Sequence, residues 1–265
     1  MRYLKTLLCV LPILSAFSSL PAKAKPSDVQ LMQAMTDYKI YIIKQLQQFV
    51  THTDALTSAL KAGNVSAAQE LYVSTRVYYE HIEPATISLR SLNQRIDGSD
   101  DNQLGFRYIA QLLWRSGTDS AQLSKPADKL ESDVKSMQNE LTMNSFETRA
   151  MLKGALEDIA ENEHRSEEGS KQLSAQDFLS EQYASLKGVE QLYLVLKPLI
   201  EQESPQLKTN LDKHFSKMNQ WMSQYQTTIG GFEQLSSLKE GQRQALVKQW
   251  QQLHNLFGQL VNVLL

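Results

Sequence analysis

Hydrophobic side chains recur at steps of three and four residues along most of the chain, which is the spacing of one face of an α-helix. The first stripe runs through Leu31, Met35, Tyr38, Ile42, Leu46 and Phe49. Ser27 and Gln30, just before it, have the spacing of a capping box, and Gly63 is a suitable C-terminal cap. The pattern predicts a first helix of about 33 residues, which would be about 50 Å long.

The same spacing predicts helices through the rest of the chain. Their expected ranges are 66–84, 87–96, 103–116, 126–142, 145–165, 174–203, 205–227 and 239–264, with a turn over 97–101. A second capping-box pattern at Ser66 and Gln69 opens the first of these, and Pro198 is expected to kink or break a later one. Because no segment alternates convincingly like a β-strand, we expect an all-α fold. The long helices and short connections favour an antiparallel up-and-down helical bundle, formed as a single domain by residues 25–265.

The first 24 residues have a different character. Arg2 and Lys5 precede an apolar run over residues 7–20, and residues 22–24 read Ala-Lys-Ala, a signal-peptidase pattern. The apolar run has about 14 residues, whereas a membrane-spanning helix needs about 20. We therefore interpret residues 1–24 as a secretory signal peptide cleaved near Ala24, and expect no membrane span in the mature protein.

Composition narrows the possible functions. The chain has 27 Lys and Arg against 29 Asp and Glu, a formal charge of −2, so it lacks the basic excess that is typical of nucleic-acid-binding proteins. Its single cysteine, Cys9, excludes a disulfide framework and a Cys-rich metal site. Cleavage after Ala24 would remove Cys9 and three basic residues, leaving 24 basic against 29 acidic residues, a charge of −5.

Candidate chemistry comes from carboxylates, because the sequence contains no G-x-S-x-G or H-E-x-x-H motif. Glu80 and Glu83 are three residues apart on a predicted helix, so they share a face and can converge on one cation with oxygen ligands. Asp97, with Asp100 and Asp101, follows in the turn where the chain returns. A solvated acidic face is the alternative interpretation, and on spacing alone it is favoured.

A second acidic cluster falls on a later predicted helix. It comprises Glu157, Glu161, His164 and Glu168, at steps of four, three and four. A carboxylate-bridged di-iron bundle needs two Glu-x-x-His pairs and two further glutamates, and this cluster has one such pair. Glu161, His164 and Glu168 are therefore secondary acidic candidates, and the polar face of an exposed helix is the favoured interpretation.

Two segments match a known pattern. Residues 72–84 (YVSTRVYYEHIEP) fit Y-x-x-x-R-x-x-Y-E-x-I-E-P, and residues 105–114 (GFRYIAQLLW) are similar to G-F-H-x-x-E-x-x-L-W. These are patterns of the imelysin-like EfeO/EfeM family of periplasmic iron-uptake components, which the chain resembles over about residues 28–264. It resembles the short form of that family, without the cupredoxin-like N-terminal domain. The resemblance implies a periplasmic location, Glu80, Glu83 and Asp97 as metal ligands, and iron or another oxygen-ligated cation as the metal.

The chain departs from that family at its H-x-x-E motif, which is implicated in metal binding. Arg107 stands at the histidine position and Ala110 at the glutamate position. Arginine is always charged and has no lone pair to donate, and alanine has no ligand atom. Arg107 could instead lie against Glu80 or Glu83 as a substitute cation, which would turn the metal site into an ion-pair network. If it faces solvent, the carboxylate site stays open.

Two functions follow. The first is a non-catalytic periplasmic metal-binding component of an iron-uptake system, a monomer whose implied partners are an iron permease and a periplasmic peroxidase. The alternative is a degenerate family member that binds no metal and uses the same cleft for a partner protein or an anionic polysaccharide. Such a ligand would be attracted to Arg107 and the neighbouring Arg76, Arg90 and Arg95. The name imelysin carries a peptidase association, but without H-x-x-E we expect no enzyme.

Overall fold

The computed structural model describes residues 25–98, 103–168, 177–227 and 231–265. The predicted signal peptide, Asp100 and Asp101 lie outside these residues. Within them the α-helices are α1 (Asp28–Lys61), α2 (Val65–Ile82), α3 (Arg90–Asp97), α4 (Gly105–Leu113), α5 (Ser120–Met143), α6 (Thr148–Glu168), α7 (Phe178–Glu203), α8 (Pro205–Ser223) and α9 (Glu240–Leu264). Short 3₁₀ turns are η1 (Glu83–Ala85), η2 (Ile87–Leu89) and η4 (Leu235–Ser237). The predicted all-α fold is confirmed.

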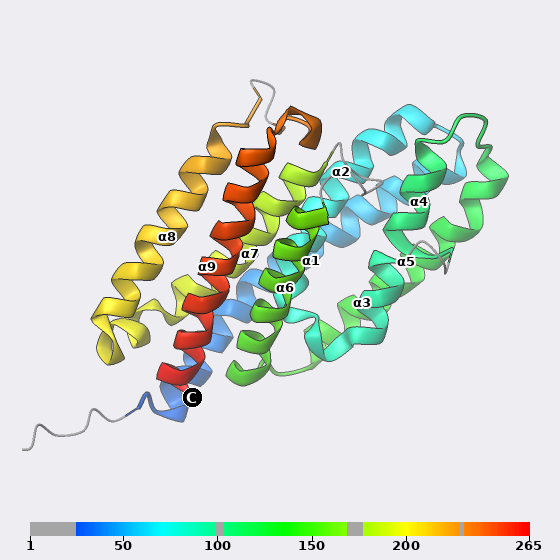
Figure 1. The fold of residues 1–265 in the computed structure, drawn as a ribbon. Helices are drawn as coiled ribbons and strands as arrows, with labels where there is room; N and C mark the ends of the chain where they lie inside the picture. The colour runs from blue at the N-terminus through cyan, green and yellow to red at the C-terminus, as the bar shows by residue number, and fades with distance from the viewer. Residues whose placement is uncertain (1–24, 99–102, 169–176, 228–230) are drawn as a thin grey trace, which may run out of the picture.

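Helices α1 and α2 form the centre of the bundle. α1 packs along α2, α5 and α7, while α2 also packs on α7 and α4. To one side lie α6, α7, α8 and α9, with α6 against α9 and α7 against α8; to the other lie α3, α4 and α5 (Figure 1). The start of α1 lies near the C-terminus, at one end of the molecule. Elements of both sides therefore meet at the last turn of α2.

Helix starts follow local capping chemistry, and at α2 and α5 the observed cap is not the predicted one. Ser27 and Gln30 form the predicted capping box of α1. α2 is capped by Asn64, whose side chain accepts the Ala67 N–H at 3.2 Å, so the predicted cap at Ser66 is wrong. α5 begins six residues before Pro126 because Asp119 and Gln122 form a capping box.

Proline does not end the helices that contain it. α7 runs without a break from Phe178 to Glu203, with Pro198 inside it. The helix expected over 66–84 ends at Ile82, where the chain continues as the 3₁₀ turn η1, and Pro84 is the second residue of that turn. No described helix combines the length and the hydropathy that a bilayer-spanning segment requires.

An aromatic cluster fills the core beside the end of α2. Phe49, Tyr79 and Phe106 lie with ring centroids 5.6 to 6.2 Å apart, and all three are buried. The Arg76 guanidinium lies over Tyr79 and Phe106, at 5.1 and 5.2 Å from the ring centroids. This contact brings a permanent positive charge into the core at the point where α2, α4 and α7 meet.

Candidate functional site

A close approach of α2 and α7 brings Glu80, a predicted ligand, and Glu181 to the same arginine. Gly188 of α7 lies against the end of α2, where an added Cβ would be 2.8 Å from the His81 carbonyl oxygen and 3.2 Å from that of Glu80. Because only glycine leaves room for this approach, α7 can bring the carboxylate of Glu181 to the same Arg76 guanidinium that Glu80 contacts.

A tight turn positions Asp97, another predicted ligand. Gly105, the first residue of α4, has φ +69°, and an added Cβ would lie 2.4 Å from the Ile96 carbonyl oxygen. The end of α3 and the start of α4 are therefore in contact, which places Asp97 beside Arg107. The Arg107 Nε donates to Asp97 Oδ2 at 3.1 Å.

Three carboxylates from different elements meet behind these contacts. Glu80 of α2, Glu83 of η1 and Asp158 of α6 each offer an oxygen, and these oxygens lie within 4.8 Å of one another. We call these three residues the acidic triad. All are buried, with 0%, 9% and 3% of their surface exposed. The structure thus brings Glu80 and Glu83 together as the sequence predicts, with Asp158 as the third member.

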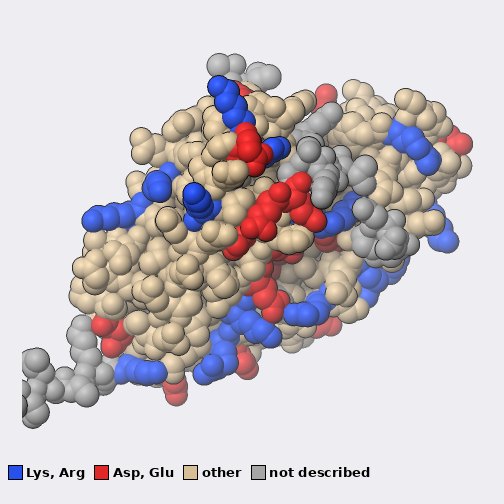
Figure 2. Space-filling model, viewed as in Figure 1, with Lys and Arg blue, Asp and Glu red and all other residues tan. Residues whose placement is uncertain are grey.

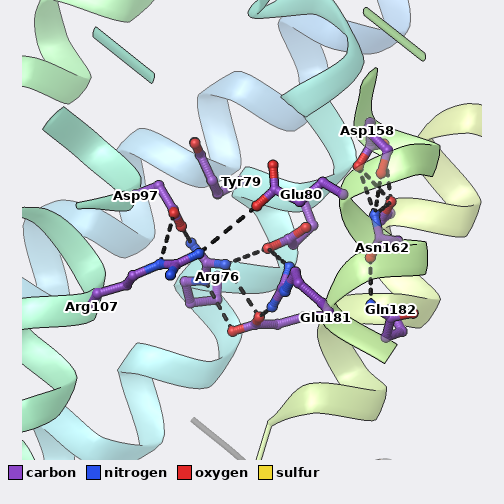
Figure 3. A network of polar contacts seen from close by, with 12 residues as sticks. Arg76, Tyr79, Glu80, Asp97, Arg107, Asp158, Asn162, Glu181 and Gln182 are labelled. Atoms are coloured by element: carbon purple, nitrogen blue, oxygen red, sulfur yellow. Dashed lines mark hydrogen bonds and ion pairs between the residues drawn. The ribbon is translucent and has the colours of Figure 1, made fainter. Parts of the chain in front are cut away.

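Two buried arginines contact Glu80 of the triad, and Figure 3 shows the contacts of one of them, Arg76. Arg76 contacts Glu80 Oε1 at 2.5 Å, Asp97 Oδ1 at 2.7 Å and Glu181 Oε1 at 3.0 Å. Arg165 contacts Glu80 Oε1 at 3.4 Å and also pairs with Glu181. Both guanidiniums therefore reach the same oxygen of Glu80, while its Oε2 is buried without a hydrogen-bond partner among the described residues.

The pKa values of the triad shift in the opposite direction to those of Asp97 and Glu181. Burial raises the pKa of Glu80 to about 7, and burial together with the nearby Glu80 raises the pKa values of Glu83 and Asp158 well above their ordinary range. Burial acts on Asp97 and Glu181 too, but Arg76 and a second guanidinium outweigh it, so the pKa of each is lowered. The carboxyl groups of the triad therefore hold their protons to higher pH than Asp97 and Glu181 do, and a bound cation would have to displace those protons.

Arg107 does not play the role of a substitute cation against Glu80 or Glu83. Its side chain is 44% exposed, pairs with Asp97 and lies 3.9 Å from Glu161 Oε1. The arginines that contact Glu80 are Arg76 and Arg165, both buried. Asp97 itself is held between Arg76 and Arg107 and is not a member of the triad.

The other motif position and the second acidic cluster hold no ligand group at the triad. Ala110 is buried in the core with 3% exposure. Glu161, His164 and Glu168 are 43%, 67% and 46% exposed, and His164 pairs with Glu168 at 3.8 Å. Among the described residues this cluster forms the exposed face of α6, in agreement with the favoured interpretation.

Sequence reasoning missed Asp158, Arg165 and Glu181. A signal for the first two was present on α6, where Met151, Ala155, Asp158, Asn162 and Arg165 follow at steps of four and three and are all buried. Polar residues in phase with an apolar stripe indicate a buried polar site. The acidic residues that the sequence analysis chose on this helix are on its other face.

The arginines proposed to attract an anionic ligand are all engaged. Besides Arg76 and Arg107, Arg90 pairs with Glu157 at 3.1 Å and Arg95 with Asp133 at 3.1 Å. The face shown in Figure 2 carries basic and acidic side chains interspersed, with a band of acidic ones near its centre. These contacts give the anion-binding alternative no free cluster of arginines.

Similarity to known proteins identifies the family of this chain. Residues 88–260 match the Imelysin (Peptidase_M75) family model. The chain is 32% identical over 240 residues to the iron uptake system component EfeM of Pseudomonas syringae pv. syringae, covering 86% of this chain and 83% of that protein. It is 30% identical over 239 residues to the iron uptake system component EfeO of Escherichia coli K12, covering 85% of this chain and 62% of the longer relative. The chain therefore belongs to the imelysin family, together with EfeM and EfeO.

Proposed function

We propose that this protein is a non-catalytic, cation-binding component of an EfeM/EfeO-like iron-uptake system, and that it holds its cargo cation at the acidic triad. The observation that carries the proposal is Glu80 Oε2, a fully buried carboxyl oxygen that has no hydrogen-bond partner in the described part of the chain and lies next to two other buried carboxyl groups. A buried charged oxygen without a partner is costly, and a bound cation removes that cost.

The donor set selects the kind of cation. The triad offers carboxylate oxygens from Glu80, Glu83 and Asp158, and oxygen ligands suit hard cations such as Fe³⁺, Mn²⁺ and Ca²⁺. Arg76 and Arg165 contact Glu80 through Oε1 and pair with Asp97 and Glu181, so Glu80 Oε2, Glu83 and Asp158 remain as oxygen donors that a cation can bind when it displaces their protons. We place Asp97, the ligand implied by the family resemblance, outside the coordination sphere, where it holds Arg76 and Arg107.

A binding role fits the named relatives better than a peptidase role does. EfeM and EfeO are both named as iron uptake system components. The position of the family's motif histidine is Arg107, which cannot bind a metal, and the glutamate position is Ala110. We therefore propose transfer of a cation, without peptide-bond cleavage, as the activity of this chain.

Location and partners belong to the same proposal. Residues 1–24 have the pattern of a signal peptide cleaved near Ala24, which would deliver the protein to the periplasm. There we propose that it acts as a monomer and passes iron to a membrane permease, with a periplasmic peroxidase as a further partner. The support for these partners is the description of its relatives as components of a system.

Calorimetry with the protein secreted through its own leader tests the proposal. Titrations use Mn²⁺, and Fe³⁺ supplied as its citrate complex. We expect saturable binding that Glu83→Gln and Asp158→Asn each weaken by roughly tenfold or more, because each removes one ligand charge. Glu157→Gln is the matched control, since this carboxylate is next to Asp158 in sequence but is 42% exposed and pairs with Arg90. If the unaltered protein bound neither Mn²⁺ nor Fe³⁺, the proposal would be overturned.

A further inference from the structure

A chain of buried hydrogen bonds links the acidic triad to α9, on the far side of α6 and α7. Trp250 Nε1 of α9 donates to Gln182 Oε1 of α7 at 2.5 Å. Gln182 Nε2 donates to Asn162 Oδ1 of α6 at 2.6 Å, and Asn162 Nδ2 donates to Asp158 Oδ1 at 2.8 Å. The last two contacts are drawn in Figure 3. Trp250, Gln182 and Asn162 are completely buried, so water does not substitute for any of these bonds.

The two ends of this chain fix the direction of every bond in it. An indole N–H can only donate, so Gln182 must turn its oxygen toward Trp250 and its amino group toward Asn162. At the other end, Asn162 Nδ2 also donates to the backbone carbonyl oxygen of Asp158 at 2.9 Å, and that oxygen can only accept. Each amide therefore has one orientation that satisfies both neighbours.

The direction of these hydrogen bonds determines which donors the Asp158 carboxylate receives. The carboxylate receives donors on its α6 and α7 side, from Asn162 and from Ser185 Oγ, which lies 2.9 and 3.0 Å from its two oxygens. These donors hold the carboxylate of Asp158 in place, and one of its oxygens lies within 4.8 Å of oxygens of Glu80 and Glu83. Partners of this kind orient the ligands of metal sites and affect metal affinity.

We propose that Trp250 is a positioning residue for the acidic triad, acting through Gln182 and Asn162 on the orientation of Asp158. This inference rests on the proposed cation-binding function. Without the indole N–H, the oxygen of Gln182 keeps only the hydroxyl of Ser166, 3.1 Å away, which can rotate to accept as well as donate. Gln182 then loses one of the two contacts that fix its amide, so its donation to Asn162 Oδ1, which together with the Asp158 carbonyl oxygen orients the Asn162 amide, is held less firmly.

The test is cation affinity measured by calorimetry with Mn²⁺ on the secreted full chain. Trp250→Phe is expected to weaken binding roughly tenfold relative to the unaltered protein. Phe257→Leu is the matched control, because Phe257 is a buried aromatic residue of the same helix that contacts Phe215 and takes no part in the chain of hydrogen bonds. It should lower the melting temperature and leave the affinity unchanged.

A double-mutant cycle separates positioning from packing. If Trp250 acts through Asn162, then Trp250→Phe has no further effect on affinity once Asn162→Ala has cut the chain. Gln182→Met, which keeps Trp250 and removes both amide bonds, gives a second measurement should Trp250→Phe fail to fold, and is expected to show the same roughly tenfold loss. Equal affinity of the folded variants and the unaltered protein, or additive effects in the cycle, would overturn this inference alone. Absence of binding by the unaltered protein would overturn the proposed function and this inference with it.

Discussion

Arg76 holds Glu80 through one carboxylate oxygen, Oε1, and leaves Oε2 without a hydrogen-bond partner in the described part of the chain. Because Arg165 reaches the same Oε1, the two guanidiniums stabilise the buried glutamate without closing its second oxygen. An arginine-rich site of this kind is compatible with cation binding, since the guanidiniums are shared among Glu80 Oε1, Asp97 and Glu181, and Glu80 Oε2 is left open beside the other two carboxylates of the triad.

The stability of the cation-free protein should fall as pH rises. In the folded protein the pKa of Glu80 is raised to about 7 and that of Glu83 well above its ordinary range, whereas unfolded glutamates release their protons near pH 4.3. Since the folded state binds more protons in this window, its triad contributes most to stability below about pH 4.3, and this contribution is lost as pH rises.

Urea denaturation with a chelator between about pH 5 and 8 measures this effect. Glu83→Gln should flatten the fall, and excess Mn²⁺ should remove much of it, because the cation replaces the protons. A variant profile parallel to that of the unaltered protein would show that Glu83 does not carry a raised pKa.

Gly188→Ala should destabilise the protein. The added methyl group would lie 2.8 Å from the His81 backbone oxygen, so α7 must move away from α2 at a cost of about 1–3 kcal/mol. Gly258→Ala in α9 is the matched control, because a Cβ there meets nothing within 4 Å and alanine favours the helix by about 0.5–1 kcal/mol. Thermal denaturation compares the two. Equal changes in both variants would contradict the close approach at Gly188.

Arg165→Met should lower the free energy of unfolding of the cation-free protein by about 3–5 kcal/mol, because it leaves Glu181 and Glu80 buried with one cationic partner fewer. Arg90→Met removes a partner from an exposed pair with Glu157, for which the expected change is about 1 kcal/mol or less. Chemical denaturation at neutral pH measures both. A loss in Arg165→Met no larger than that in Arg90→Met would mean that the buried network is not formed in solution.

Arg107→Ala should keep cation binding and tighten it by at most a few fold. The guanidinium is half-exposed and contacts Asp97 and Glu161, so its removal takes away a partly screened positive charge near the triad. Calorimetry with Mn²⁺ measures the change. A large loss of affinity would show that Arg107, at the position of the family's motif histidine, has become part of the cation site.

The apolar periodicity predicted the helices, but it could not predict the members of the site. Glu80 and Glu83 are close in sequence, so helical spacing alone places them on one face. Asp158 lies 75 residues after Glu83, on a different helix, and joins them only through tertiary packing. The sequence left the position of Arg107 open for the same reason: the turn at Gly105 directs it to Asp97, while Arg76 and Arg165 supply the buried charge at Glu80.

Anomalous diffraction from crystals soaked with Mn²⁺ tests the central claim most directly. The proposal predicts one anomalous peak within about 2.0–2.6 Å of Glu80 Oε2 and of carboxylate oxygens of Glu83 and Asp158. In crystals of Asp158→Asn soaked in the same way, this peak should be weaker or absent. A peak coordinated by Asp97 in place of Asp158, or no peak among these carboxylates, would contradict it.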